Sequence, residues 1–363
     1  MRKYVYIPII LIIIIIIIIL IIKNNRYTSS RKYSYYYTER IYNIQRELFE
    51  TNNIYNDNRY WNIYLPNGYN NIELELKMIN TESYGKNKFI FGINGCDWIV
   101  SKNGLWHLLE KKYSREQARY IMPETYILNN KKDINLIKRN FHGQNFIMKK
   151  NIQRKNGIKI TNNINEIIEG FKNDYKIVQR YVENVFLVNR RKLNIRVYIL
   201  VVYNKSVKFY IHKDSKCIYT NKDYNNDITD FETNITSYKM DYIIYENNPF
   251  SIEELNYYIY KNHGNNIDLF IKIKELMTLV GRACLTSIKK SSNIRKATTY
   301  QLFGADVILD NNFIPYLLEI NKGPDMKIRC DRDKILKEKV YRDIYDTLGI
   351  IKEDNNRFIM LNV

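Results

Sequence analysis

The stretch Gln301–Pro324, QLFGADVILDNNFIPYLLEINKGP, decides the fold, because it predicts a β-hairpin whose strands carry acidic side chains. Two apolar runs flank the polar turn Asp310–Asn312. Side chains two apart on a strand share a face, so Glu319 and Asn321 can converge, and Asp306 can face them from the neighbouring strand. Two carboxylates and an amide oxygen are hard ligands of the type that binds Mg²⁺. We therefore predict a metal site; the alternative is an exposed sheet edge with solvated acids.

Further short apolar runs predict that this hairpin belongs to a larger α+β fold. The predicted strands are 89–93, 123–128, 145–148, 176–179, 195–202, 207–211, 303–309 and 314–320. The predicted helices are 105–121, 164–171 and 267–288. We expect the strands between 145 and 211 to be consecutive strands of one sheet. In the last helix an apolar stripe at three- or four-residue spacing predicts a core-facing side: Phe270, Ile273, Met277, Val280, Cys284 and Ile288.

Two basic sets precede the hairpin. Lys149 and Lys150 end a predicted strand and are followed by a polar loop and Gly157, although the Walker pattern of a phosphate-binding loop is absent. Further on, Lys192, Asn194 and Arg196 fall on one face of a predicted strand, as expected for an anionic ligand lying on the sheet. For both sets a solvated, half-exposed surface remains the alternative.

The N-terminal segment is apolar from Tyr4 to Ile22 and flanked by basic residues. Its 19 residues match the length of roughly 20 that a helix needs to cross a bilayer, and no small-residue cleavage site follows it. We expect an uncleaved transmembrane anchor at 1–23, rather than a signal peptide, in a single-pass membrane protein whose catalytic domain is cytosolic. Residues 24–87 lack a sustained period and are expected to form a polar stalk or lead-in.

The composition restricts the partners. The net charge of +19 is typical of a protein that binds a polyanion: nucleic acid, an anionic membrane face or an acidic protein segment. The four cysteines include no CxxC pair, so neither a disulfide framework nor a zinc site is predicted, and a reducing compartment is expected. No zinc-finger, RNP-like or helix-turn-helix cue appears, so nucleic acid is not the expected partner.

In their order along the chain these segments resemble the tubulin–tyrosine ligase-like proteins, which are ATP-grasp amide ligases. The resemblance covers about 88–350. The segments that carry it are PETYIL at Pro123, the strand ending at Lys149, VQRYV at Val178, RKLNIRVY at Arg191, Thr233-Asn234, FGAD at Phe303 and LLEINKGP at Leu317. The resemblance implies an N-terminal lobe at 88–145, an ATP-grasp ligase core at 146–350 and a C-terminal tail at 351–363.

The resemblance also implies the roles of individual residues. Nucleotide-binding positions would be Lys149 and Lys155 at the phosphates, Gln179, Arg180, Tyr181 and Val182 beside the adenine, Lys192 near the ribose, and Thr233 and Asn234 near the terminal phosphate. Catalytic positions would be Arg196, Lys149 and Asn234, and magnesium ligands would be Asp306, Glu319 and Asn321. ATP and Mg²⁺ are thus the expected cofactors.

The expected reaction joins an amino acid, glutamate or tyrosine, to a carboxylate of a protein such as the acidic tail of tubulin, through an acyl-phosphate. Glutamate is favoured because more family members use it. Two positions depart from the family pattern: Asn194 stands where an aspartate is usual, and Ile218 where a second arginine is common. These departures favour one alternative, a catalytically impaired member that binds acidic tails or microtubules and tethers them to a membrane.

Overall fold

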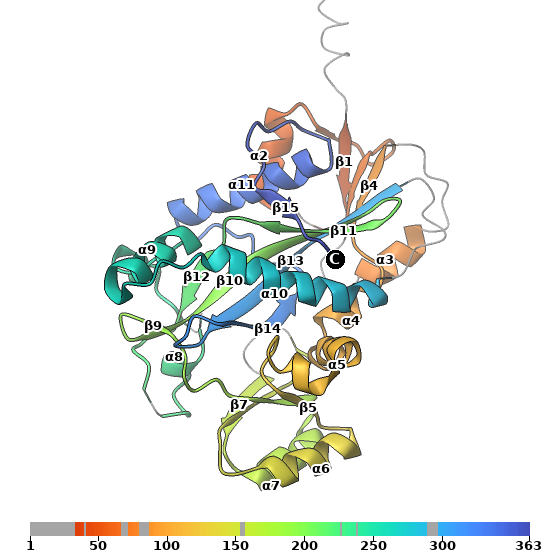
Figure 1. Cartoon of the computed structure of the whole chain (residues 1–363). Coiled ribbons are helices and arrows are strands. Elements are labelled where there is room, and N and C mark those ends of the chain that lie inside the picture. Colours follow the sequence, from red (N-terminus) through yellow and green to blue (C-terminus); the bar gives the residue numbers. More distant parts are fainter. Residues whose placement is uncertain are drawn as a thin grey trace, which may run out of the picture.

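In the part of the chain that the structure describes, helices pack around two β-sheets, which confirms the predicted α+β class (Figure 1). The computed structural model describes residues 33–39, 41–66, 72–79, 87–152, 157–225, 227–236, 239–288 and 297–363. Within these residues the larger sheet has 11 strands and the smaller sheet has 4. In Figure 1 the smaller sheet, with α6 and α7, lies below the larger one.

The larger sheet is organised around two long antiparallel strands, β10 and β13, which pair from Ile195 opposite Val307 to Tyr203 opposite Thr299. Its main path follows the order β15 (Phe358–Met360), β11 (Val207–His212), β10 (Arg191–Tyr203), β13 (Ala297–Leu309), β4 (Lys88–Phe91), β3 (Ile63–Leu65), β1 (Ser34–Tyr37), β2 (Tyr55–Asn56). Three further strands pair beside this path: β9 (Leu187–Val188) and β12 (Lys216–Tyr219) with β10, and β14 (Pro315–Asn321) with β13.

The predicted hairpin is confirmed as β13 and β14, but the expectation of one sheet for the strands between 145 and 211 is wrong. Four strands form the smaller sheet, in the order β5 (Thr125–Ile127), β8 (Ile177–Arg180), β6 (Phe146–Lys149), β7 (Ile158–Thr161). β10 and β11 belong to the larger sheet. Each run has the alternation of a strand, but which strands pair depends on contacts between distant segments, and a local pattern does not contain them.

The helices pack on these sheets as amphipathic elements. They are α2 (Asn43–Thr51), α3 (Ile72–Ile79), α4 (Cys96–Val100), α5 (Lys102–Ala118), α6 (Lys131–Asn140), α7 (Ile164–Glu169), α8 (Phe231–Asn234), α9 (Ile252–His263), α10 (Leu269–Cys284) and α11 (Asp331–Thr347), with short 3₁₀ turns η3 (Gly170–Asn173), η4 (Tyr242–Glu246) and η5 (Leu285–Ser287). α10 runs along the larger sheet (Figure 1). The core-facing stripe predicted for it is confirmed, because Ile273, Met277, Val280 and Cys284 are buried.

The segment predicted as a polar stalk is folded wherever the structure describes it. β1 pairs with β3, and β3 pairs with β4, so this segment extends the larger sheet. Its tyrosines and other aromatic residues supply much of the apolar surface that this segment buries. Tyr35 and Phe49, for example, lie in the core with ring centroids 4.6 Å apart. The sequence pattern missed this because tyrosine and asparagine dominate the segment, and only tertiary packing shows which rings are buried.

The predicted boundaries also differ from the structure at two other places. β5 lies before residue 146 but pairs with β8 beyond it, so the boundary between an N-terminal lobe and a ligase core at 145/146 cuts through the smaller sheet. In the expected tail, β15 pairs with β11 and closes one edge of the larger sheet.

The prediction of a single-pass membrane protein with a cytosolic catalytic domain is corrected. Across the part of the chain that the structure describes, none of the helices combines the length and the apolar character needed to cross a bilayer. The segment 4–22, on which the prediction depended, lies outside the described residues.

Arg115, near the end of α5, connects that helix to the smaller sheet and α6. Its guanidinium bonds the carboxylate of Asp133 and donates to the carbonyl of Thr125 at 3.1 Å. Asp133 is only 4% exposed and also accepts the backbone N–H of Ile127 at 2.7 Å. Burial raises the pKa of Asp133, while the Ile127 amide and Arg115 oppose this rise. Arg115 thus balances a buried carboxylate and joins the two parts of the fold.

We predict that Arg115→Ala lowers the free energy of unfolding by about 3 kcal/mol, because it leaves Asp133 buried without its counter-charge. Arg119→Ala is the matched control: Arg119 is exposed and its side chain bonds only the Tyr120 hydroxyl among the described residues, so a change of about 0.5 kcal/mol or less is expected. Urea denaturation followed by tryptophan fluorescence measures both. Equal stability of the two variants would contradict this role of Arg115.

Candidate functional site

A cavity of about 260 Å³ lies where the smaller sheet faces the larger one. Of the side chains predicted for a site, those that line it are Lys149, Gln179, Arg180, Tyr181, Val182, Lys192, Arg196, Asn234, Asp306, Glu319 and Asn321. Thr233 is buried beside it and does not line it. Lys155 lies outside the described residues. The structure therefore brings together eleven residues that are dispersed between positions 149 and 321.

The floor of the cavity is a row of charged side chains across β10, β13 and β14. Strand pairing sets Arg196 opposite Asp306, and Asp306 opposite Glu319. The Arg196 guanidinium donates twice to Asp306, from Nε to Oδ1 at 2.6 Å and from Nη2 to Oδ2 at 3.1 Å. Asn321 Nδ2 donates to Asp306 Oδ2 at 3.3 Å. The predicted convergence of Asp306, Glu319 and Asn321 is thus present.

A bulge in β14 shapes this row. The pairing shifts by one residue between Asp306 and Val307, so that Val307 lies opposite Leu317 and Leu318 is the extra residue. As a consequence Leu318 and Glu319, although adjacent in sequence, both line the cavity. The bulge therefore allows an apolar and an acidic side chain from consecutive positions to face the same ligand.

Gly304 makes room for the arginine. A Cβ at this position would lie 3.0 Å from Arg196 Cδ and 3.0 Å from Pro324 Cβ, closer than side-chain carbons normally approach. The glycine of the FGAD segment is therefore required by the passage of the Arg196 side chain over β13.

Glu319 is suited to bind a cation. Burial alone would raise the pKa of its carboxyl group, but the positive charges of Lys102, Lys149 and Arg196 lower it below the usual value. Asp306 responds oppositely: burial raises its pKa, and Arg196 counteracts only part of the rise. An ionised carboxylate next to a second carboxylate and an amide fits the donor set that Mg²⁺ prefers.

Lys102 is a cavity residue that sequence reasoning missed. It begins α5, directly after the helix-capping Ser101, and its Nζ lies 3.8 Å from Glu319 Oε2. Lysine at a helix start has no distinctive sequence signal, and only the tertiary structure, which brings the start of α5 within reach of Glu319, makes it a cavity residue. Its ammonium adds a cation beside the proposed metal ligands.

The wall on the side of the smaller sheet is fixed by a chain of hydrogen bonds. Lys149 Nζ donates to Gln179 Oε1 at 2.7 Å, and Gln179 Nε2 donates to Thr125 Oγ1 at 2.9 Å. Lys149 is 5% exposed, and burial lowers its pKa to about 8. Gln179 thereby orients the Lys149 side chain. Among the described side chains, no carboxylate forms an ion pair with Lys149.

A second buried lysine, Lys192, stands on β10 four residues before Arg196. Its Nζ donates to Tyr181 Oη at 2.6 Å and lies 4.9 Å from the centre of the Tyr224 ring. Burial lowers the pKa of Lys192 to about 7. The Tyr181 hydroxyl in turn donates to Asn234 Oδ1 at 2.5 Å. The lysine is therefore ready to accept an anionic group of a ligand as its counter-charge.

Thr233 and Asn234 are adjacent in sequence but have different positions relative to the cavity. Asn234 lines the cavity, and its Nδ2 donates to the Asp227 carbonyl at 2.6 Å and to Thr233 Oγ1 at 2.9 Å. Thr233 Oγ1 donates to the carbonyl of Asp230, the N-cap residue of α8, at 2.9 Å. Thr233 therefore positions Asn234 in this structure and does not itself reach the cavity.

Asn151 ties the smaller sheet to α5 above the cavity. Its Oδ1 accepts the backbone N–H of Lys102 at 3.1 Å, and its Nδ2 donates to Asn103 Oδ1 at 2.8 Å. The first N–H groups of a helix have no partner within the helix, so the contact with Lys102 satisfies one of them. These bonds fix the end of β6, and hence Lys149, relative to α5.

The lining combines cations with an apolar surface. Six basic side chains, Lys102, Lys149, Lys150, Arg180, Lys192 and Arg196, face only two acidic ones among the described lining residues. Apolar side chains such as Ile147, Ile308 and Ile320 complete it. A flat apolar group attached to several phosphates matches this distribution, because the cations neutralise the phosphates and the apolar side chains cover the ring.

Comparison with known proteins is consistent with this site. A sequence model of the tubulin-tyrosine ligase family matches residues 82–357. The chain is 29% identical over 205 residues to "Tubulin glycylase 3D" of Tetrahymena thermophila, which covers 53% of this chain and 20% of that protein. It is 26% identical over 190 residues to "Probable alpha-tubulin polyglutamylase Ttll1" of the same organism, covering 50% and 44%. A human protein, "Tubulin monoglutamylase TTLL4", is 22% identical over 285 residues, covering 71% and 23%. The match thus spans less than half the length of each of these relatives.

We predict that the affinity of the cavity for ATP falls as the pH rises from 6 to 9, because Lys149 binds the phosphates, and Lys192 attracts them from its place near the ribose, only while each is protonated. Each coupled proton weakens binding by up to about tenfold per pH unit above the pKa of its lysine. Lys192→Met should remove the part of this dependence that is centred near pH 7. Isothermal titration calorimetry at several pH values measures the affinity of each protein for ATP. The protonation of ATP affects both proteins equally, so it cancels when their pH profiles are compared.

The control is Lys222→Met, since Lys222 is a lysine outside the cavity that pairs with Glu232. Its pH profile should match that of the unmodified protein. A profile of Lys192→Met that also matches would mean that the charge of Lys192 does not contribute to nucleotide binding.

Proposed function

The chain belongs to the tubulin-tyrosine ligase family, and on this basis we propose that it is an ATP-dependent ligase that joins an amino acid to a carboxylate of a protein. The observation that carries the proposal is the row Arg196, Asp306 and Glu319 at the floor of a cationic cavity between two sheets. Such a pair of sheets with a nucleotide held between them is the arrangement of the ATP-grasp fold, which we assign to this chain.

The nucleotide would lie with its base beside the segment Gln179–Val182 and the apolar side chains. Its phosphates would extend toward Lys149 and Arg196, and Lys192 would contact the ribose side. Asp306, Glu319 and Asn321 would hold Mg²⁺, which supplies positive charge at the phosphate oxygens. Each of these assignments uses the chemistry of a side chain that lines the cavity.

The proposed reaction needs no side-chain nucleophile. An oxygen of the acceptor carboxylate attacks the terminal phosphorus of ATP, the bond to the bridging oxygen breaks, and ADP leaves. The neutral amine of the incoming amino acid then attacks the acyl-phosphate carbon. The bond from that carbon to the phosphate oxygen breaks, phosphate leaves, and the nitrogen loses a proton to water, so that an amide forms. Negative charge spreads over the transferring group, so Arg196, Lys149 and the amide of Asn234 act by positioning that group and by electrostatic stabilisation.

The proposed acceptor is an acidic protein tail of the tubulin type, and glutamate is the proposed amino acid. The similarity to a tubulin glycylase and a probable tubulin polyglutamylase supports a tubulin acceptor. It also makes glycine a substrate to test. The net charge of +19 supports an acidic acceptor.

A second candidate is a catalytically impaired protein that binds acidic tails without modifying them. One structural observation favours it: Asn194 and Ile218, the two departures from the family pattern, lie directly opposite each other on β10 and β12. Both differences therefore affect one place, beside Lys192.

The deciding experiment incubates the full chain with Mg-ATP, αβ-tubulin and labelled glutamate, glycine or tyrosine, each in turn. The proposal expects label in tubulin and one ADP per amide formed. Binding of tubulin without label or ADP would support the impaired candidate and contradict the ligase.

We predict that Glu319→Gln lowers the rate of ligation on the order of 100-fold, because it removes a charge from the metal ligands and leaves the side-chain volume unchanged. Glu116→Gln is the control, since Glu116 is exposed on α5. It should ligate at the unmodified rate. Ligation by Glu319→Gln at the rate of the control would place the metal ligands elsewhere.

A further inference from the structure

The smaller sheet has a second face, opposite the cavity. Strand alternation sends Ile147 and Lys149 of β6 to the cavity, while Phe146 and Met148 point to the other face. There they pack with Ile137 of α6 in a separate apolar core. α6 therefore covers the side of the sheet that does not contact the proposed nucleotide.

The exposed side of α6 is cationic. Lys131, Lys132, Lys138 and Arg139 are all exposed, and the one acidic residue of the helix, Asp133, is turned inward to Arg115. None of the four cations forms an ion pair with any residue that the structure describes. Lysines around the neighbouring α7 differ: Lys159 pairs with Glu166 at 3.0 Å and Lys172 with Glu169 at 4.0 Å. The charge on α6 is thus not neutralised by any acidic side chain among the described residues.

The arrangement of these cations is regular. Lys131 and Lys138 are seven residues apart, as are Lys132 and Arg139, so each pair lies on one stripe with a spacing of about 10 Å. Lys131 and Lys132 also occupy the first turn, where the helix dipole disfavours positive charge by about 0.3–1 kcal/mol per residue. The helix itself gains nothing from them there.

From these observations we propose that the outer face of α6, formed by Lys131, Lys132, Lys138 and Arg139, is a docking surface for an acidic segment of the protein acceptor. The proposal rests on the proposed function for the identity of that acceptor. An acidic segment fits because two stripes of ammonium and guanidinium groups match repeated carboxylates. The exposed face of α6 presents no aromatic ring on which a nucleic-acid base could stack, which favours the peptide over RNA.

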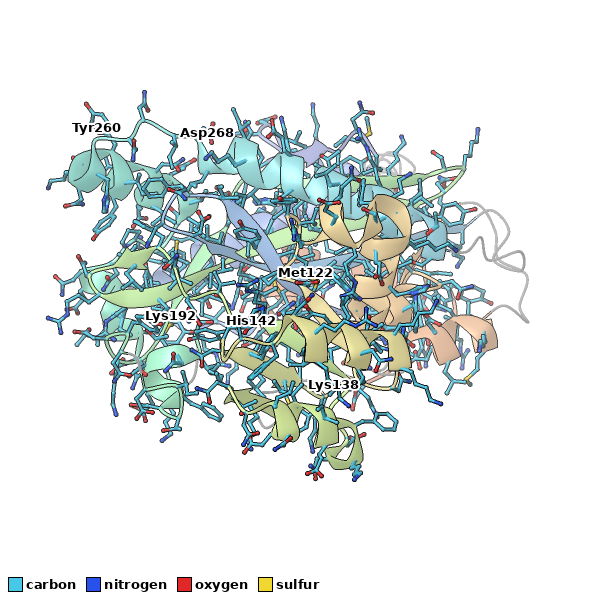
Figure 2. All side chains as sticks on the ribbon, turned by 60° about the horizontal axis from the view of Figure 1, so that its bottom comes forward. Met122, Lys138, His142, Lys192, Tyr260 and Asp268 are labelled. Atoms are coloured by element: carbon cyan, nitrogen blue, oxygen red, sulfur yellow. The ribbon has the colours of Figure 1, made fainter. Side chains whose placement is uncertain are left out.

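Binding at α6 leaves the cavity open. In Figure 2, which brings the smaller sheet forward, Lys138 lies well apart from Lys192 of the cavity wall. One part of an acceptor can therefore contact α6 while another part supplies the carboxylate that reacts. The surface acts on acceptor affinity, whereas the rate of the chemical steps depends on the cavity.

The test compares two charge-reversal variants of the full chain. Lys131→Glu with Lys138→Glu changes the α6 surface. Lys205→Glu with Lys208→Glu is the matched control: both lysines are exposed, unpaired with any described acid, and located at the β10–β11 hairpin, away from the smaller sheet. The net charge changes equally in the two variants.

The probe is a fluorescent poly-glutamate peptide, measured by anisotropy, and Mg-ATP affinity verifies that each variant is folded. We expect the Kd for the peptide to rise about tenfold in the α6 variant, equivalent to about 1.4 kcal/mol, and less than twofold in the control. In a ligation assay the α6 variant should show a higher KM for tubulin and an unchanged kcat.

Unchanged peptide binding in the α6 variant would overturn the docking surface, and so would an equal loss of binding in both variants. A third contradicting outcome comes from competition: RNA would displace the peptide at a lower concentration, counted in negative charges, than unlabelled poly-glutamate does. Absence of ligation in the unmodified protein would contradict the proposed function, but selective loss of peptide binding in the α6 variant would still support the surface.

Discussion

The antiparallel pairing of β10 with β13 is the constraint on which the rest of the site depends. It places the Arg196 guanidinium against the Asp306 carboxylate, and the pairing of β13 with β14 adds Glu319 to the same row. Desolvating a guanidinium and a carboxylate opposes folding, even when they form two good hydrogen bonds. Apolar residues would pack at these positions at least as well. The presence of these charges, together with the glycine that makes room for Arg196, is understood if the row binds a charged ligand.

The smaller sheet completes the site from the other side. Its strands supply Lys149 and Gln179, and two contacts to α5 hold it in place: the ion pair of Arg115 with Asp133 and the hydrogen bonds of Asn151. Two buried lysines with lowered pKa values then line the same cavity: Lys149 of the smaller sheet faces the acidic row, and Lys192 lies on β10, four residues before Arg196. A ligand that carries several negative charges would restore full charge to both lysines. The same sheet presents the cations of α6 to solvent, so acceptor and nucleotide would contact opposite faces of one rigid element.

Local patterns predicted much of this arrangement. The alternation around Asp306 and Glu319, with the turn between them, was sufficient to predict the hairpin, and the stripe of α10 was sufficient to predict its buried side. The pairing of distant strands was not predictable in this way. The strands expected in one sheet belong to two, and the tyrosine-rich segment expected to be a stalk or lead-in forms strands of the larger sheet. Lys102 was missed because a lysine at a helix start becomes a cavity residue only through packing. Thr233 was expected at the ligand, but its hydroxyl serves the orientation of Asn234.

The central claim is that Asp306, Glu319 and Asn321 hold a divalent cation against a nucleotide in the cavity. Electron paramagnetic resonance of Mn²⁺ tests it most directly, because Mn²⁺ takes the same oxygen ligands as Mg²⁺ and its signal reports binding without turnover. The account predicts Mn²⁺ binding that requires ATP, and a loss of affinity of at least about tenfold in Asp306→Asn. Asp310→Asn, in the turn of the same hairpin, should bind as the unmodified chain does. Mn²⁺ binding in Asp306→Asn equal to that of the unmodified chain would contradict the account.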